Sequence, residues 1–137
     1  MIIMLIKFHS FKIDTKKNFE VIDITSKIND LIDIDEGIVS IFSKHSTTAI
    51  VVNENERGLL NDFELMMNDV VSDKFSYEHD RIDDNARSHL MSFLLSSSEC
   101  LPVRNSRLDL GTWQSVFLVE LDGPRHGRKI ELTMVGE

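Results

Sequence analysis

The order of hydrophobic and polar residues in the first part of the chain predicts two strands, a helix and two further strands. Apolar and polar residues alternate approximately over residues 3–13 and 19–24, and the polar run DTKKN between them suggests a hairpin. Residues 24–32 then place their apolar side chains at helical spacing. The segments GIVSIF and TTAIVV are apolar at nearly every position, which is typical of strands buried on both faces.

The middle of the chain carries two amphipathic patterns, and the last third returns to strands. Apolar residues recur at helical spacing over residues 59–71 and over residues 82–94, so two helices joined by a loop are predicted. TWQSVFLVEL and RKIELTMVGE are predicted strands, separated by the turn DGPRHG. The predicted order is ββαββααβββ in a single domain of residues 1–137. Because strands outnumber helices without strict alternation, we expect an α+β fold with a mainly antiparallel sheet or β-sandwich.

The charge of the chain restricts the classes of partner. The formal net charge is −8, which argues against a nucleic-acid partner because phosphate contacts need clustered cations. Residues 53–84 contain ten Asp and Glu residues against three Lys and Arg residues, whereas five Lys and Arg residues lie in the last third. This distribution is typical of a solvated acidic helix and a basic hairpin, but a phosphorylated substrate with a metal would also fit it.

Two further features bear on the compartment. Cys100 is the only cysteine, so an internal disulfide is excluded, and its side chain is expected to be small buried filler rather than a nucleophile. The apolar opening MIIMLI covers only six residues before Lys7, which is too short for a secretion signal or a membrane span. We therefore expect a cytoplasmic protein without a membrane partner.

Three of the five histidines occupy positions that suggest chemistry. His45 lies between two predicted buried strands, His79 lies in the loop segment YEHD, and His89 shares the apolar stripe of the last predicted helix. A single histidine on an apolar face is usually a core residue. Together, however, neutral imidazoles could bind a divalent metal (zinc or magnesium) or carry out acid–base chemistry. The spacing matches neither HExxH nor a CxxC pair, so these roles stay open.

Other polar groups suggest a site for an anion. Asn85 lies one turn before the last of these histidines and is placed to hold its ring. The segment HSTT offers hydroxyls and backbone N–H groups, although strand propensity alone also favours threonine. Arg125 and Arg128 in GPRHGR could bind a phosphate or could form only a basic hairpin tip. Trp113 and Gln114 are expected on opposite faces of a strand, one of them packing while the other reaches a pocket or a subunit neighbour.

In combination, several segments resemble the YjbQ family. They are HSTTAIVVNENE, YEHD followed by DDNARSHL, LPVRNSRLDLGTWQSVFLVELDGPR and the final VGE, in matching order from His45 to Glu137. The resemblance implies a compact α+β fold containing a β-sandwich, assembled as a homotrimer with a polar pocket near a subunit interface. It also implies thiamine phosphate synthase activity, which joins a pyrimidine diphosphate to a thiazole phosphate with loss of pyrophosphate. In this family that activity is regarded as secondary.

The resemblance also implies which residues form the site. The matching positions are His45, Thr47, Asn53, Glu54, His79, Asp84, Asn85, His89, Trp113, Gln114 and Arg125. His45 and Glu54 are expected at the two ends of one strand that forms the floor of the pocket. The chain departs from the family pattern at turns, with Ser96 and the pair Asn105-Ser106 where glycine is usual. These departures concern backbone conformation rather than chemistry.

We therefore predict an enzyme that acts on a small phosphorylated or pyrophosphorylated molecule, with thiamine phosphate formation as a candidate activity. The predicted catalytic residues are His45, Glu54, His79 and His89, and the three histidines are also the predicted metal ligands. The predicted substrate-binding residues are Thr47, Asn53, Asn85, Trp113, Gln114, Arg125 and Arg128. The alternative is a non-catalytic trimeric accessory protein that binds an anion or a metal.

Overall fold

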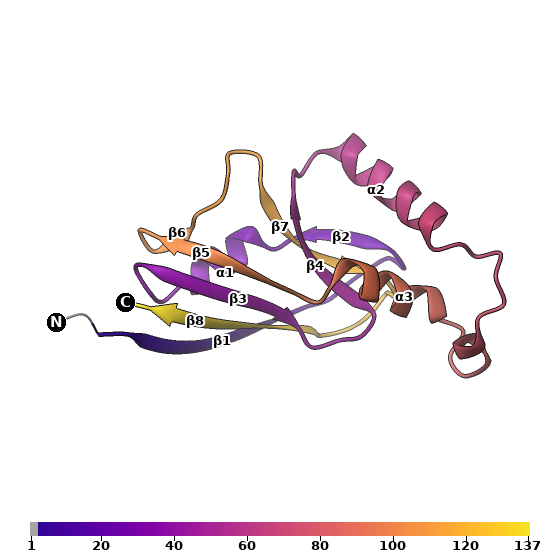
Figure 1. Cartoon of the computed structure of the whole chain (residues 1–137), viewed down its shortest axis with the longest axis horizontal. Coiled ribbons are helices and arrows are strands. Elements are labelled where there is room, and N and C mark those ends of the chain that lie inside the picture. Colours follow the sequence, from indigo (N-terminus) through magenta and orange to yellow (C-terminus); the bar gives the residue numbers. More distant parts are fainter. Residues whose placement is uncertain (1–2) are drawn as a thin grey trace.

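The computed structural model describes residues 3–137, and within that range the chain forms eight strands and three α-helices (Figure 1). The five-stranded sheet has the order β1 (Leu5–Ile13), β8 (Arg128–Gly136), β3 (Gly37–Ser43), β5 (Ser98–Arg104) and β6 (Arg107–Leu108). The three-stranded sheet has the order β2 (Glu20–Asp23), β7 (Ser115–Glu120) and β4 (Thr48–Asn53). The helices are α1 (Thr25–Leu31), α2 (Arg57–Val70) and α3 (Ala86–Leu95), and a 3₁₀ turn, η1, covers Glu78–Arg81. All strand pairs are antiparallel.

The α+β class with three α-helices and antiparallel sheets is confirmed, but the predicted order differs in detail. Among the described residues four strands follow α3 rather than three, because the segment LPVRNSRL folds into the β5–β6 pair. The turn of this pair contains Asn105 and Ser106, with φ of 52° and 63°. Two non-glycine residues thus adopt the left-handed conformation for which glycine is usual. The last helix begins at Ala86 rather than at Ile82.

Neither predicted hairpin forms, because consecutive strands join different sheets. β1 pairs with β8, from Leu5 opposite Gly136 to Ile13 opposite Arg128, whereas β2 pairs with β7. β7 and β8, on either side of DGPRHG, also lie in different sheets, as do β3 and β4. The polar connections therefore cross from one sheet to the other. This brings the ends of β3 and β7 close to the starts of β4 and β8, where the candidate site lies.

One hydrophobic cluster is shared by the two sheets. Val39, Ile41 and Leu132 of the five-stranded sheet and Ile50 and Leu118 of the three-stranded sheet belong to it, and all five are fully buried. Burying one such side chain contributes about 1.5–3 kcal/mol. This packing fixes the strands, and with them the polar residues at the strand ends.

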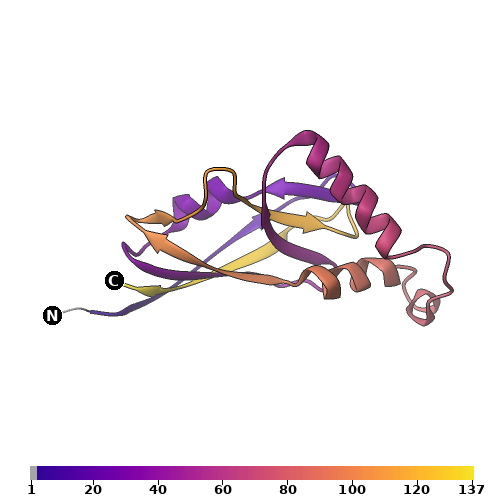
Figure 2. The same cartoon turned by 45° about the horizontal axis from the view of Figure 1, so that its top comes forward.

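The helices α2 and α3 cover the other face of the three-stranded sheet, at the end of the molecule opposite the chain termini (Figure 2). Met67 of α2 and Met91 of α3 cluster with Val119 of β7. This second cluster explains why β4 and β7 are buried on both faces. β3 departs from the prediction, because its Ile38 and Phe42 are 47% and 40% exposed.

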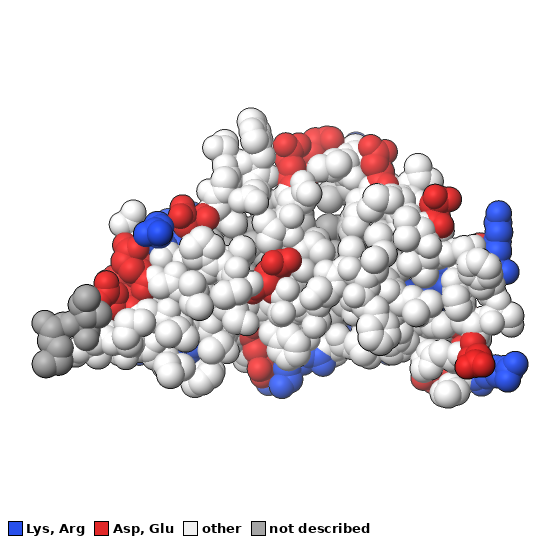
Figure 3. All heavy atoms as spheres, viewed as in Figure 1, with Lys and Arg blue, Asp and Glu red and all other residues white. Residues whose placement is uncertain are grey.

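The surface in Figure 3 agrees with the uneven charge of the sequence. Acidic side chains gather along the edge over α2, while the middle of this face, over β5 and α3, carries few charges. Cys100 on β5 is exposed, so the prediction of a buried cysteine is wrong. No helix within residues 3–137 is long and apolar enough to cross a membrane. Of the apolar opening MIIMLI, residues 1–2 lie outside the described residues.

Candidate active site

The turn between β3 and β4 carries His45 and Thr47 and is held by backbone groups on both sides. The Lys44 N–H donates to the Lys129 carbonyl over 3.1 Å, and the Lys129 N–H donates to Nε2 of His45 over 2.8 Å. On the other side, the Leu121 N–H donates to the Thr47 carbonyl over 3.1 Å. These contacts place the half-buried imidazole of His45 at the wall of a concavity.

The hydrogen bond to His45 decides which ring nitrogen carries the proton. Because a backbone N–H can only donate, Nε2 is the acceptor, and the neutral ring carries its proton on Nδ1. Burial, with the positive charge of Arg128 and to a lesser extent of Arg125, lowers the pKa of His45, while the Glu120 carboxylate opposes this effect. The ring is therefore favoured in its neutral form, as a hydrogen-bond donor through Nδ1.

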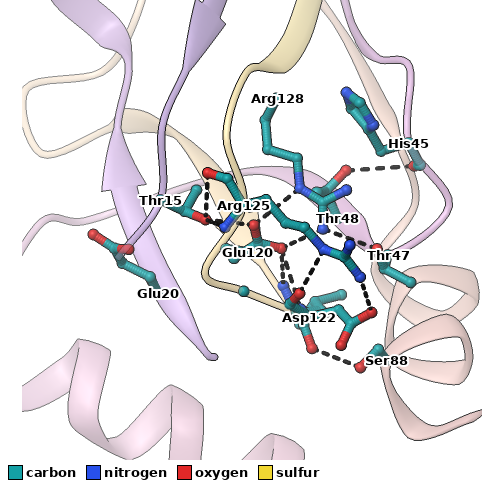
Figure 4. A network of polar contacts seen from close by, with 12 residues as sticks. Thr15, Glu20, His45, Thr47, Thr48, Ser88, Glu120, Asp122, Arg125 and Arg128 are labelled. Carbon is teal, nitrogen blue, oxygen red and sulfur yellow. Dashed lines mark hydrogen bonds and ion pairs between the residues drawn. The ribbon is translucent and has the colours of Figure 1, made fainter. Parts of the chain in front are cut away.

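Glu120 and Arg128 form a buried ion pair beside this turn (Figure 4). Glu120 is fully buried and Arg128 is 5% exposed. Arg128 donates from Nε to Oε1 of Glu120 over 2.9 Å and from Nη2 to Oε2 over 2.6 Å. Its Nη2 also donates to the Thr47 hydroxyl over 2.9 Å. The polar groups of Arg128 and Thr47 that the sequence assigns to substrate are thus engaged within the protein.

Asp122 connects Arg125 to the start of α3. Its Oδ2 accepts a hydrogen bond from Nη2 of Arg125 over 2.8 Å and another from Nδ2 of Asn85 over 2.9 Å. Asn85 therefore holds Asp122 rather than the ring of His89, and its buried Oδ1 has no hydrogen-bond partner among residues 3–137. The side chain of Arg125 is 51% exposed, so this arginine remains accessible to an anion.

His79 and His89 form an edge-to-face pair of imidazoles beside α3. The 3₁₀ turn η1 presents His79 and α3 presents His89, with ring centroids 4.7 Å apart and ring planes at 82°. Nε2 of His79 is buried and has no hydrogen-bond partner in the described part of the chain, and Oδ2 of Asp83 lies 3.9 Å from it. Buried polar atoms are normally paired, so a ligand that reached this nitrogen would gain an interaction.

Two concavities meet at His89 and Phe93. The first, of about 350 Å³, extends to His45 and is also lined by four serines, Ser46, Ser92, Ser96 and Ser97. The second, of about 360 Å³, extends to His79 and Tyr77. The three histidines singled out in the sequence are therefore arranged along one hollowed region, with His89 in the middle.

Leu90 and Phe93 of the apolar stripe of α3 line these concavities and are exposed. Phe93 and Leu94 are 85% and 58% exposed, whereas the buried residues of the helix are Ala86, Ser88, Met91 and Ser92. The two buried serines donate hydrogen bonds of 2.6 Å, from Ser88 to the Leu121 carbonyl and from Ser92 to the Thr48 carbonyl. Because these hydroxyls are paired, a partly polar face can pack on the strand ends, which apolar periodicity does not predict.

Four predicted site residues lie apart from the histidines within one chain. His45 precedes β4 and Asn53 is its last residue. The six residues of β4 span about 20 Å, so the two side chains lie at opposite ends of the strand. Glu54 lines a separate, mainly apolar groove of about 380 Å³ between α2 and the three-stranded sheet. Trp113 and Gln114 lie in an exposed turn before β7 rather than on opposite faces of a strand. One chain therefore does not gather all the predicted residues into one pocket.

The histidines fit a metal only in part. Among residues 3–137 no group of three His, Cys, Asp or Glu side chains is arranged to hold a metal ion. Nε2 of His45 accepts the Lys129 N–H, which leaves His79 and His89 as the neighbouring imidazoles. Catalytic zinc sites usually have three protein ligands. A zinc or magnesium ion at these two residues would therefore need a further donor.

The sequence patterns missed the residues that hold this region together, foremost Glu120 and Asp122. A signal for Glu120 was present, because it is the one charged residue in the apolar run VFLVEL. A charge in a strand buried on both faces needs a partner. Arg128 could not be recognised as that partner, because the predicted hairpin does not show that the two strands join different sheets.

Nearly the whole chain matches one protein family. The model of the UPF0047 protein YjbQ-like family covers residues 9–137. The chain belongs to this family. A UPF0047 protein of Methanothermobacter thermautotrophicus is 48% identical over 126 residues, which cover 90% of the present YjbQ-like chain and 87% of the relative. The UPF0047 protein YjbQ of Salmonella typhimurium is 36% identical over 117 residues, covering 84% and 85% of the two chains.

Solved structures share the fold of this YjbQ-like chain. A YbjQ-like protein of unknown function from Sulfolobus solfataricus P2 has a TM-score of 0.94 at 42% identity, covering 98% of this chain and 99% of that chain. A hypothetical protein from Aeropyrum pernix K1 has a TM-score of 0.90 at 32% identity, covering 96% and 99%. Family membership establishes the fold, whereas function has to be inferred from the chemistry of the site.

Proposed function

We propose that this YjbQ-like protein is an enzyme that binds a small phosphorylated or pyrophosphorylated molecule in the concavity between His45 and His89. The observation that carries the proposal is the concavity of about 350 Å³ lined by His45 and His89, near which the side chain of Arg125 is 51% exposed. Ser46, Ser96 and Ser97 of the concavity and the accessible guanidinium of Arg125 add hydrogen-bond donors suited to phosphate oxygens, whereas the Ser92 hydroxyl is already bound to the Thr48 carbonyl.

As the specific reaction we propose thiamine phosphate formation, which the family resemblance implies. The ring nitrogen of the thiazole phosphate attacks the methylene carbon of the pyrimidine diphosphate. A carbon–nitrogen bond forms, the bond from that carbon to the diphosphate oxygen breaks, and pyrophosphate leaves with the electron pair. The protein then needs no covalent nucleophile. Its contribution would be to stabilise the charge that develops on the leaving group, through donors such as the Nδ1–H of His45 and the Arg125 guanidinium.

A homotrimer would explain why the predicted site residues fall into two groups. Asn53, Glu54, Trp113 and Gln114 of one copy would complete the histidine region of a neighbouring copy. Exposed apolar side chains offer surface for such contacts, among them Phe8 at 72% and Phe93 at 85% exposure. A divalent metal, zinc or magnesium, belongs to the same proposal, with His79 and His89 as two of its ligands and further donors from the substrate or the neighbour.

Thiamine phosphate formation by untagged protein tests the reaction. We expect His89→Ala to lower turnover by about 10²-fold or more. His9→Ala is the matched control, because His9 lies on β1 and contacts Asp33 away from the concavities. Each protein is assayed with and without a chelator, and loss of activity on chelation would support the metal. Inactivity of the folded wild-type protein under all conditions would contradict the proposed reaction.

The second candidate is a non-catalytic accessory protein that binds an anion or a metal. One observation favours it: the buried Arg128 is engaged by Glu120, which leaves Arg125 as the accessible arginine beside His45. Calorimetric titration with pyrophosphate distinguishes the two functions. Binding without turnover, lost in Arg125→Gln but kept in the surface control Arg104→Gln, would support the binding protein.

A further inference from the structure

Five donors surround the buried carboxylate of Glu120. Oε1 accepts hydrogen bonds from the Thr15 hydroxyl over 2.6 Å and from Nε of Arg128 over 2.9 Å. Oε2 accepts from Nη2 of Arg128 over 2.6 Å and from the N–H groups of Leu121 and Asp122 over 3.0 and 3.1 Å. Burial raises the pKa of Glu120, but the hydrogen bonds outweigh this effect and lower it overall. The carboxylate is therefore ionised and fixed in place.

The fixed carboxylate determines where the guanidinium of Arg128 lies. Two nitrogens of Arg128 are bound to Glu120, and one of them, Nη2, also reaches the Thr47 hydroxyl over 2.9 Å. Because Arg128 is 5% exposed, water has little access to replace these partners. The start of β8 is thereby tied to the turn that carries His45. We call Thr15, Thr47, Glu120 and Arg128 the Glu120 network.

The contact with His45 is made by the residue that follows Arg128. Lys129 donates its N–H to Nε2 of His45 over 2.8 Å, and its carbonyl accepts the Lys44 N–H over 3.1 Å. The distance from the Lys129 N–H to the His45 ring depends on the position of β8 relative to the turn between β3 and β4. Within the described part of the chain, two side-chain contacts join β8 to the turn: the exposed ion pair of Lys44 with Glu131 at 3.7 Å, and the buried connection through Glu120, Arg128 and Thr47. The buried connection is the one shielded from water.

We propose that Glu120 is a positioning residue that, through Arg128 and Thr47, keeps the Lys129 N–H on Nε2 of His45 and so holds the ring in the Nδ1–H tautomer. In the neutral state His45 then acts as a hydrogen-bond donor toward the concavity, not as a base or metal ligand through Nε2. This assignment deepens the proposed function, on which its catalytic meaning rests, by giving His45 one definite role toward a phosphate oxygen.

A purely structural ion pair would behave differently from a positioning residue. Loss of a structural pair lowers stability but leaves the proton on the same ring nitrogen in the molecules that stay folded. Loss of a positioning residue lets the ring and the Lys129 N–H separate, so that Nε2 can take the proton. The tautomer of His45 therefore separates the two roles, whether or not a substrate is known.

The test is long-range ¹H–¹⁵N NMR of the imidazole nitrogens, at a pH well above the ordinary histidine pKa of about 6.5. The proteins are wild type, Glu120→Gln, Thr47→Val and the control Ser88→Ala. Thr47→Val cuts the tie but leaves the ion pair intact, so it decides the question if Glu120→Gln fails to fold. Ser88→Ala removes a buried hydrogen bond of 2.6 Å to the Leu121 carbonyl, outside the Glu120 network.

We expect wild type and Ser88→Ala to show a single Nδ1–H tautomer of His45. In the folded variants of Glu120 and Thr47, the ratio of Nδ1–H to Nε2–H should fall by about tenfold, the equivalent of one lost hydrogen bond. An Nε2–H tautomer in wild type, or an unchanged ratio in the folded variants, would overturn the proposal. If the tautomer responds as expected but wild type binds no pyrophosphate, the proposed function fails while the positioning role stands.

Discussion

Two polar regions at the same end of the molecule differ in how completely their groups are paired. In the Glu120 network, a fully buried carboxylate and a 5% exposed guanidinium are joined by two hydrogen bonds and supported by two hydroxyls. At the concavities that meet at His89, the buried Nε2 of His79 has no partner among the described residues, and the same holds for Oδ1 of Asn85 just before α3.

The difference shows which polar residues support the site and which are available to a ligand. A buried charge persists in a fold only when other groups pair with it, so a saturated network is a scaffold. Unpaired polar atoms in a hollowed surface cost stability unless something binds there. The network therefore positions the turn of His45, and the region of His79 and His89 is where added hydrogen-bonding partners would act.

The largest expected effect comes from breaking the scaffold. Arg128→Ala leaves the fully buried carboxylate of Glu120 without its counter-charge, so we expect the free energy of unfolding to fall by about 3–5 kcal/mol. Urea denaturation measures this loss. Arg104→Ala is the matched control, because its ion pair to Asp109 at 3.3 Å is exposed and contributes less than about 1 kcal/mol. Equal losses of unfolding free energy in the two variants would show that the buried network stabilises the fold no more than a surface ion pair does.

Acid should weaken the scaffold in two stages. Burial, Arg128 and Arg125 lower the pKa of His45 in the folded protein. The contribution of neutral His45 to stability is therefore complete above about pH 6.5 and is lost as the pH falls through the folded-state pKa. For Glu120, hydrogen bonds outweigh burial and lower the pKa. The contribution of its carboxylate to stability is therefore complete above about pH 4.5 and is lost at lower pH.

Urea midpoints measured across this pH range follow both stages. We expect His45→Gln to remove the upper stage and to leave the lower one. A midpoint in wild type that does not change between neutral pH and the lower stage would contradict the low pKa of His45.

A smaller effect is expected where the backbone itself is strained. Ser96, which lines the concavity with His45 and His89, has φ of 78° and ψ of 155°, a conformation suited to glycine. Ser96→Gly should raise the free energy of unfolding by about 1 kcal/mol. The neighbouring Ser97→Gly should lower it by about 0.5–1 kcal/mol, because there glycine only adds freedom to the unfolded chain. Thermal unfolding measures both, and a loss in Ser96→Gly would argue that its side chain supports the fold.

The smallest effect on stability is expected at the unpaired histidine. His79→Phe keeps a ring beside His89 and removes the buried Nε2 that has no partner, so stability should stay within about 1 kcal/mol of wild type. Thr15→Val, which removes a paired hydroxyl of the Glu120 network, should cost about 1–3 kcal/mol. Chemical denaturation compares the two variants. A larger loss in His79→Phe would show that this ring belongs to the scaffold.

The sequence by itself determined most of the helices and strands and part of the candidate chemistry. Periodicity indicated the strand segments, α2 and the α+β class, because local burial patterns follow from the geometry of each element. The segments HSTT, YEHD and GPRHGR were recognisable, since their polar residues interrupt apolar runs. Of the histidines singled out in the sequence, His45, His79 and His89 do lie along one hollowed region.

Only the tertiary structure decided which strands are neighbours. β1 pairs with β8 across the length of the chain, and β7 and β8 join different sheets, which no local pattern specifies. The pairing of Glu120 with Arg128 and the hydrogen bond from Lys129 to His45 depend on this crossing. The same geometry separates Glu54 and Trp113 from the histidines in one chain.

Contacts between distant segments depend on how whole sheets and helices pack, because each residue's local pattern is satisfied in many arrangements. Burial of Glu120 is the clearest case. Its sequence context shows that the charge needs a partner, but only the crossing of the strands determines that the partner is Arg128 and that His45 is held beside it.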